Sequence, residues 1–228
     1  SGRVLVGLSR TPLPGTWAVL HRVHMRGASG PMDSTRTGPQ GDYRITIARA
    51  DTTAMYVVSS WYRGIAYFSE PVPVRRRSAA TLKPILVYDT TSAGPPIREQ
   101  RRLVTISLPG KDGTRAVLEL LALVNPGTAT RIAPDTIHAT WAGLVPHDAI
   151  QFEAGEGDIS AQAVGLRGDT VAVFGPIPPE DAKQLSYSYV LPATTKQLTI
   201  PIDQPTGELD LLIEDTTAKD PSAGTSYG

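Results

Sequence analysis

The stretch LVTISLPGKDGTRAVLELLALV, residues 103–124, decides the fold class of this chain. Two runs rich in Val, Ile and Leu, residues 103–108 and 115–124, flank a polar segment that contains Asp112-Gly113. Asp-Gly between two such runs is a strong signal of a β-hairpin, because a tight turn needs residues that accept a positive φ. The stretch therefore predicts two antiparallel strands joined by a turn at residues 110–113.

The rest of the chain repeats this pattern of short apolar runs bounded by Gly or Pro. Gly and Pro number 21 and 20 among 228 residues, and no long run has apolar residues at helical spacing. Tyr43, Ile45 and Ile47 alternate with polar residues, which predicts a strand over 42–48 with one buried face, entered through a positive φ at Gly41. We expect an all-β protein with less than ~10% helix. The predicted strands are 3–8, 16–24, 42–48, 54–62, 65–69, 82–88, 103–108, 115–124, 140–144, 150–153, 161–166, 170–174, 184–191, 197–202 and 208–214.

A Pro-rich, charged segment, residues 92–102, interrupts the series of strands and marks a domain boundary. We predict two antiparallel β-sandwich domains in tandem, of the transthyretin-like or immunoglobulin-like kind. The first covers residues 1–85 and the second covers 103–215. Residues 86–102 form a linker with a boundary strand, and residues 216–228 form an extended tail with few apolar side chains.

Residues 1–85 resemble the carboxypeptidase regulatory-like family of small transthyretin-like β-sandwiches. The resemblance rests on Gly2–Val4, on the Pro14–Leu20 turn and strand, on Thr35–Tyr43 as the Thr-Asp-x-x-Gly-x-Tyr/Phe signature, and on Tyr56–Val58. The chain departs from the family at Gly38, where an acid is usual. The resemblance implies a non-catalytic accessory, adhesive or folding-support domain. The second half, from Tyr88-Asp89-Thr90-Thr91 onward, resembles uncharacterised bacterial envelope β-domains.

Composition excludes several classes of protein. The chain has no cysteine, which excludes disulfides, zinc ribbons, iron–sulfur clusters and thiol catalysis. Its 22 basic and 22 acidic residues argue against a general nucleic-acid binder, which is usually basic. The chain begins at Ser1 without a signal peptide, so we expect a periplasmic or extracellular protein whose leader was removed; a tag remnant is the alternative. No apolar run approaches the ~20 residues of a spanning helix.

We find no constellation of residues that predicts catalysis, a cofactor or a metal. His21 and His24 are three apart, which on a strand places them on opposite faces. Glu153, Glu156 and Asp158 could form a calcium-dependent loop, but a simple acidic turn is the default interpretation because a closed site needs more ligands.

Two groups of residues are candidates for contact with a partner. The first comprises the arginines on either side of the boundary, which would suit an acidic protein surface or anionic lipid headgroups, or would only keep edge strands from aggregating. The second comprises aromatic residues around the turn at Arg63-Gly64. The candidates are Arg75, Arg76, Arg77, Arg98, Arg101, Arg102, Trp61, Tyr62 and Tyr67.

These observations predict a non-catalytic binding or scaffold protein outside the cytoplasm. We expect an accessory, membrane-extrinsic subunit of a larger complex, such as a respiratory, photosynthetic or cell-envelope assembly, or a filament of like subunits. A carbohydrate-binding domain is an alternative, and it requires a planar row of exposed Trp or Tyr built from Trp17, Trp61 or Trp141. An enzyme is the other alternative, and it requires a pocket that holds two acids with perturbed pKa values.

Overall fold

The computed structural model describes residues 1–24, 29–74, 79–195, 197 and 199–214. The structure is 49% strand and 1% helix, which confirms the predicted all-β class. Its contacts divide the chain into an N-terminal unit, Ser1–Thr90, and a C-terminal unit, Thr91–Gly228. Within the described residues, no helix is long and apolar enough to span a membrane.

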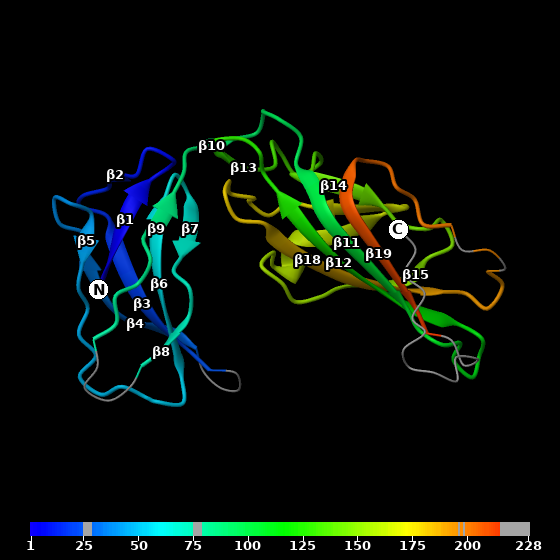
Figure 1. The fold of residues 1–228 in the computed structure, drawn as a ribbon, viewed down its shortest axis with the longest axis horizontal. Coiled ribbons are helices and arrows are strands. Elements are labelled where there is room, and N and C mark those ends of the chain that lie inside the picture. The colour runs from blue at the N-terminus through cyan, green and yellow to red at the C-terminus, as the bar shows by residue number, and fades with distance from the viewer. Residues whose placement is uncertain (25–28, 75–78, 196, 198, 215–228) are drawn as a thin grey trace. The chain divides into compact units, whose positions relative to one another are not determined.

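The N-terminal unit contains two sheets (Figure 1). Side chains of both sheets belong to one hydrophobic core. The larger sheet has the order β4-β3-β6-β7, with β8 beside β6; the smaller has the order β2-β1-β5, with β9 beside β1. Val4 and Ile85 come from the smaller sheet, and they belong to the same core as Leu20, Tyr56 and Val58 from the larger one. The strands are β1 (Gly2–Val6), β2 (Thr11–Pro12), β3 (Trp17–Val23), β4 (Gly30–Arg36), β5 (Asp42–Tyr43), β6 (Met55–Tyr62), β7 (Ile65–Phe68), β8 (Val72–Pro73) and β9 (Ile85–Val87).

Gly41 has φ +69°, as the sequence predicts. A Cβ at this position would lie 2.4 Å from the carbonyl oxygen of Val4, so only glycine fits. The strand expected after it, over 42–48, is wrong beyond Tyr43. Asp42 and Tyr43 pair with the first two residues of β1, and the ladder ends there. Ile45 and Ile47 still pack against the core, so the alternation reflects burial without strand pairing.

Strand β4 was not expected, because Gly30-Pro31 reads as a turn. It lies at the edge of the larger sheet and pairs only with β3 among the described strands. Most of its side chains are exposed, so the sequence carries no apolar alternation there.

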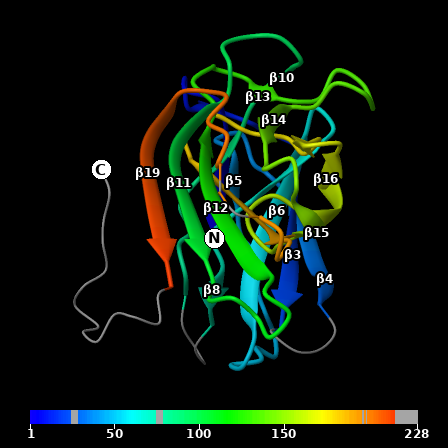
Figure 2. The same ribbon diagram turned by 90° about the vertical axis from the view of Figure 1, so that its right-hand side faces the viewer.

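The C-terminal unit contains a five-stranded sheet, a three-stranded sheet and a two-stranded ladder. The five-stranded sheet has the order β15-β18-β12-β11-β19, and Figure 2 shows β19, β11 and β12 side by side. Its core side chains, among them Val104 and Leu121, cluster with Val171 and Val173 of the three-stranded sheet β14-β17-β16. The elements are β10 (Thr90–Thr91), β11 (Arg98–Ile106), β12 (Arg115–Val124), β13 (Thr130–Arg131), β14 (Trp141–Leu144), β15 (Ile150–Ala154), the 3-10 helix η1 (Ala161–Ala163), β16 (Val164–Arg167), β17 (Thr170–Val173), β18 (Lys183–Leu191) and β19 (Thr206–Ile213).

The hairpin predicted from residues 103–124 is present as β11 and β12. The two strands are antiparallel, with Leu103 opposite Leu120 and Ile106 opposite Val117. Gly113 in the turn has φ +79°. The sequence predicts this hairpin correctly because both strands are rich in apolar side chains and Asp112-Gly113 favours a tight turn between them.

Among the described strands, two pairs contradict the expectation that all pairing is antiparallel. Strand β9 runs parallel to β1, and β19 runs parallel to β11. In addition, the described residues of the expected strand 197–202 form no strand. Pro201 lacks the N–H that a ladder needs, and its carbonyl oxygen instead accepts a hydrogen bond from Arg102.

Candidate functional site

Two tryptophans lie next to each other on the outer face of the larger sheet of the N-terminal unit. Ala18 of β3 is opposite Ser60 of β6, and both are buried on the core side. The two strands are antiparallel, so the next pair of positions after Ala18 and Ser60 is Trp17 and Trp61. Because side chains alternate along a strand, these two tryptophans lie beside each other on the outer side. Trp17 is 47% exposed and Trp61 is 61% exposed.

Phe68 and His21 extend this surface along the same face. Phe68 lies opposite Ser59 across β6 and β7, and it is 60% exposed. The His21 ring centroid lies 6.2 Å from that of Phe68. His21 Nε2 lies 2.7 Å from Ser59 Oγ, so a hydrogen bond joins these two side chains. We call Trp17, His21, Trp61 and Phe68 the aromatic face.

A cation borders the aromatic face at Trp17. Arg36 of β4 is opposite Trp17, and its guanidinium carbon lies 4.4 Å from the centroid of the Trp17 ring. The guanidinium also donates a hydrogen bond of 2.6 Å to the Gly15 carbonyl oxygen, which fixes its position. Large exposed aromatics beside an arginine have the composition that is enriched at the centre of protein interfaces.

Only some of the aromatic residues predicted to meet a partner lie on this face. Trp61 does. Tyr62 is half-buried and donates a hydrogen bond of 3.1 Å to Asp89, which also pairs with Arg63. Tyr67 is buried, and its hydroxyl donates to the Tyr88 carbonyl oxygen at 3.0 Å, so the expectation of a surface contact is corrected for this residue. The reason is strand alternation, which turns Tyr67 into the core and its neighbour Phe68 outward.

The arginines predicted to form a contact surface have different environments. Arg98 is exposed. Arg101 is exposed and pairs with Asp210 of β19 at 2.6 Å. Arg102 is only 2% exposed, so its expected role at a surface is corrected. Arg75, Arg76 and Arg77 lie outside the described residues, and their contact with a partner remains a prediction; the tail 216–228 also lies outside them.

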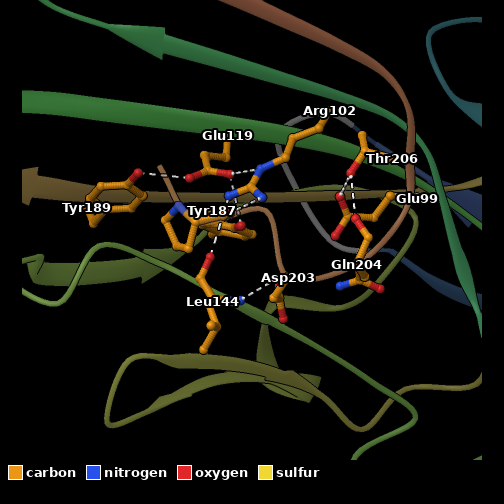
Figure 3. Close-up of polar contacts among 10 residues, drawn as sticks. Glu99, Arg102, Glu119, Leu144, Tyr187, Tyr189, Asp203, Gln204 and Thr206 are labelled. Carbon is orange, nitrogen blue, oxygen red and sulfur yellow. Dashed lines mark hydrogen bonds and ion pairs between the residues drawn. The ribbon is translucent and has the colours of Figure 1, made fainter. Parts of the chain in front are cut away.

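Arg102 belongs to a buried polar network that connects three strands (Figure 3). Its Nε donates to Glu119 Oε2 at 2.7 Å, and the Glu119 side chain is fully buried. The Tyr187 and Tyr189 hydroxyls donate to the two oxygens of the same carboxylate, at 3.0 and 2.8 Å. A second hydrogen bond of 3.0 Å connects Arg102 to the Pro201 carbonyl oxygen.

The network neutralises its own charges. Burial disfavours the charged form of Arg102, but the hydrogen bond and the charge of Glu119 outweigh that effect and raise the pKa of the guanidinium. Burial, followed by the nearby Glu119 charge, raises the pKa values of Tyr187 and Tyr189, so both hydroxyls remain protonated donors. The arrangement holds β11, β12 and β18 in register, and it accounts for both tyrosines as core residues.

A second acid, Glu99, lies in the same interior. Its Oε2 accepts a hydrogen bond of 2.8 Å from Thr206, and its Oε1 has no partner among the described residues. Burial raises the pKa of Glu99. Glu99 and Glu119 are both buried, so the pair lacks the access that an acid–base site needs for its substrate.

The histidines and the acidic loop do not converge on a common centre. His147 pairs with Asp169 at 2.6 Å and His138 pairs with Asp135 at 2.7 Å, each in an exposed pair. Asp158 accepts a hydrogen bond from the Gln184 N–H. Over the described part of the chain, no three His, Asp or Glu side chains are placed to hold a metal, and this includes the Glu153–Asp158 loop.

No protein-family model matches this chain, and no curated protein is similar to it. The resemblance of residues 1–85 to the carboxypeptidase regulatory-like family therefore remains a prediction. The evidence for the aromatic face is the position and exposure of its four side chains.

The sequence did not predict that Trp17 and His21 lie beside Trp61. The sequence alone indicates only the direction of Trp17: side chains alternate along a strand, so Trp17 points outward if Ala18 points inward. The pairing of β3 with β6 joins residues 32 to 42 positions apart, and this pairing cannot be derived from either strand separately.

Proposed function

We propose that the protein is a non-catalytic binding or scaffold protein, and that the aromatic face is its principal contact surface. The observation that carries the proposal is the exposure of three large aromatic side chains, Trp17, Trp61 and Phe68, on the outer face of one sheet. The outer face of a sheet that only meets water is normally polar. An apolar outer face is a mark of interaction with another molecule.

In this proposal the two units are β-sandwiches in tandem, and the N-terminal one is of the transthyretin-like kind. The support is that each unit has two main sheets whose facing side chains belong to one core. The sequence resemblance of residues 1–85 supports the same assignment.

The partner we propose is a protein subunit of a larger envelope or membrane complex, contacted outside the cytoplasm. Trp and Arg are the residues that most often dominate binding energy at protein interfaces, and Arg36 lies beside Trp17. In this proposal the exposed Arg98 and the basic segment 75–77 add positive charge that is complementary to an acidic partner. Such charges accelerate association more than they strengthen it.

A carbohydrate-binding domain is the second candidate, because the fold brings Trp17 and Trp61 side by side. Neighbouring exposed tryptophans offer flat surfaces for sugar rings. However, the Arg36 guanidinium already covers one face of the Trp17 ring, which favours a protein partner over a sugar.

The test is affinity purification of the full chain from its native membrane fraction under mild extraction. We expect specific protein subunits to co-purify with the wild type, and the double variant Trp17→Ala/Trp61→Ala to lose them. Ile137→Ala is the matched control, since Ile137 is an exposed apolar residue of the C-terminal unit. Retention of the same subunits by the double variant would overturn the proposal, and binding to insoluble polysaccharide that the double variant loses would favour the second candidate.

A further inference from the structure

The N-terminal unit contains a cavity on the core side of the sheet that carries the aromatic face. Its volume is about 350 Å³, within the range of small-molecule sites. Leu20 of β3 and Tyr56 and Val58 of β6 form one wall. Residues 43–47 with Ala50, together with Ala79, Ala80 and Leu82, form much of the rest.

The cavity lies where the predicted strand 42–48 fails to form. Strand pairing stops at Tyr43, and the chain from residue 44 to residue 50 continues as irregular backbone. The side chains of Ile45 and Ile47 still point toward the core and line the cavity. The ladder ends with the pair Gly2–Tyr43, at the first residue of β1, and the irregular segment after it lines the cavity.

The lining is apolar with one charged side chain. Arg44 is exposed and lines the cavity, and it has no ion pair with any other residue that the structure describes. The described lining residues include no Asp, Glu or Lys. Asp42 and Arg3 line a separate, adjoining hollow that Arg44 also borders. The cavity therefore combines an apolar interior with a cation at its exposed side.

We propose that this cavity binds a single-chain amphiphile with a carboxylate headgroup, such as a long-chain fatty acid. The hydrocarbon chain occupies the apolar interior, and the carboxylate pairs with the Arg44 guanidinium. Charge selects the ligand class, because the described lining offers a carboxylate the Arg44 guanidinium and the Ser1 ammonium group, and no competing acid. The site is independent of the aromatic face, which lies on the opposite side of the same sheet.

The experiment is isothermal titration of the full-length protein with oleate below its micelle concentration, and with oleyl alcohol as the uncharged probe of the same chain length. We expect one oleate per chain and weaker binding of the alcohol. Arg44→Gln should weaken oleate binding about tenfold and leave the alcohol unchanged. Arg63→Gln, an exposed arginine of the same unit that does not line the cavity, is the matched control and should change neither.

Two variants fill the cavity from different walls. Ala50→Phe and Ala80→Phe should each abolish binding of both probes, and circular dichroism identifies any variant that fails to fold. If both folded variants bind oleate as the wild type does, or if Arg63→Gln weakens oleate binding as much as Arg44→Gln, the proposal is wrong. Absence of oleate binding to the wild type overturns it as well. Trp17→Ala/Trp61→Ala should retain oleate binding, which separates this test from the test of the aromatic face.

Discussion

The Arg102 guanidinium and the Glu119 carboxylate lie 2.7 Å apart in the interior of the C-terminal unit, on adjacent strands of one sheet. The preceding residue, Arg101, points to solvent and pairs with Asp210. Two consecutive arginines thus form one buried and one exposed ion pair. Comparing the two pairs measures how burial changes the contribution of an ion pair to the free energy of unfolding.

Glu119→Gln should destabilise the protein by about 3–5 kcal/mol, because it leaves the buried Arg102 charge without its counter-ion. Arg101→Gln should cost about 0–1 kcal/mol, as is usual for an exposed pair. Chemical denaturation followed by fluorescence measures both free energies of unfolding. The double variant Arg102→Met/Glu119→Gln should cost clearly less than the sum of its single variants, and strict additivity would show that the pair is not coupled.

Glu99 should make stability fall as the pH rises. Burial raises its pKa in the folded protein, so the folded state holds the proton more tightly than the unfolded state does. The favourable contribution is therefore complete below the ordinary pKa of about 4.5 and is lost progressively as the pH rises through the folded-state value. Glu99→Gln should be more stable than the wild type at pH 7, with a smaller difference at pH 4. Urea denaturation at both pH values measures this, with the exposed Glu208→Gln as the control.

Gly41→Ala should be far more damaging than Gly15→Ala, although both glycines have φ near +70°. At Gly15 no atom lies within 4 Å of the added methyl group, so we expect only the backbone cost of about 1–2 kcal/mol. At Gly41 the methyl group would lie 2.4 Å from the Val4 carbonyl oxygen, and backbone cannot move as a flexible side chain can. Melting temperatures of the two variants test this, and equal values would contradict the geometry at Gly41.

Removing the Tyr43 hydroxyl should leave stability unchanged or increase it. This hydroxyl is buried without a hydrogen-bond partner among the described residues, so Tyr43→Phe removes an unsatisfied polar group. Tyr56→Phe should cost about 0.5–1.5 kcal/mol, because the Tyr56 hydroxyl accepts a hydrogen bond of 2.8 Å from the Asp51 N–H. Denaturant titration of the two variants gives the comparison, and a larger loss at Tyr43 than at Tyr56 would contradict the assignment.

The sequence predicts the parts of the fold that depend on local signals. The hairpin of β11 and β12 follows from its turn chemistry and its two apolar runs. Gly41 follows from its place between a polar turn and a buried aromatic residue. In both cases the residues next to one another in the sequence are enough to predict the local structure.

Other features depend on distant contacts and were missed for that reason. Arg102 looks like a surface residue in the sequence, and its burial is tolerable because Glu119 on the adjacent strand and the Pro201 carbonyl oxygen accept its hydrogen bonds. The edge strand β4 is polar because one side of it faces solvent. The aromatic face depends on the pairing of β3 with β6, because this pairing places Trp61 beside Trp17.

The parallel pairing of early and late strands has a mechanical consequence for each unit. The chain enters the N-terminal unit through β1 and leaves it through β9, and these two strands run in the same direction with three residue pairs between them. Tension applied to the two ends of such a unit pulls the strands along their length, so all the hydrogen bonds between them bear the load together. In the C-terminal unit, β11 and β19 form seven such pairs, so this unit should resist the greater pulling force. Single-molecule stretching should therefore show the N-terminal unit rupturing first.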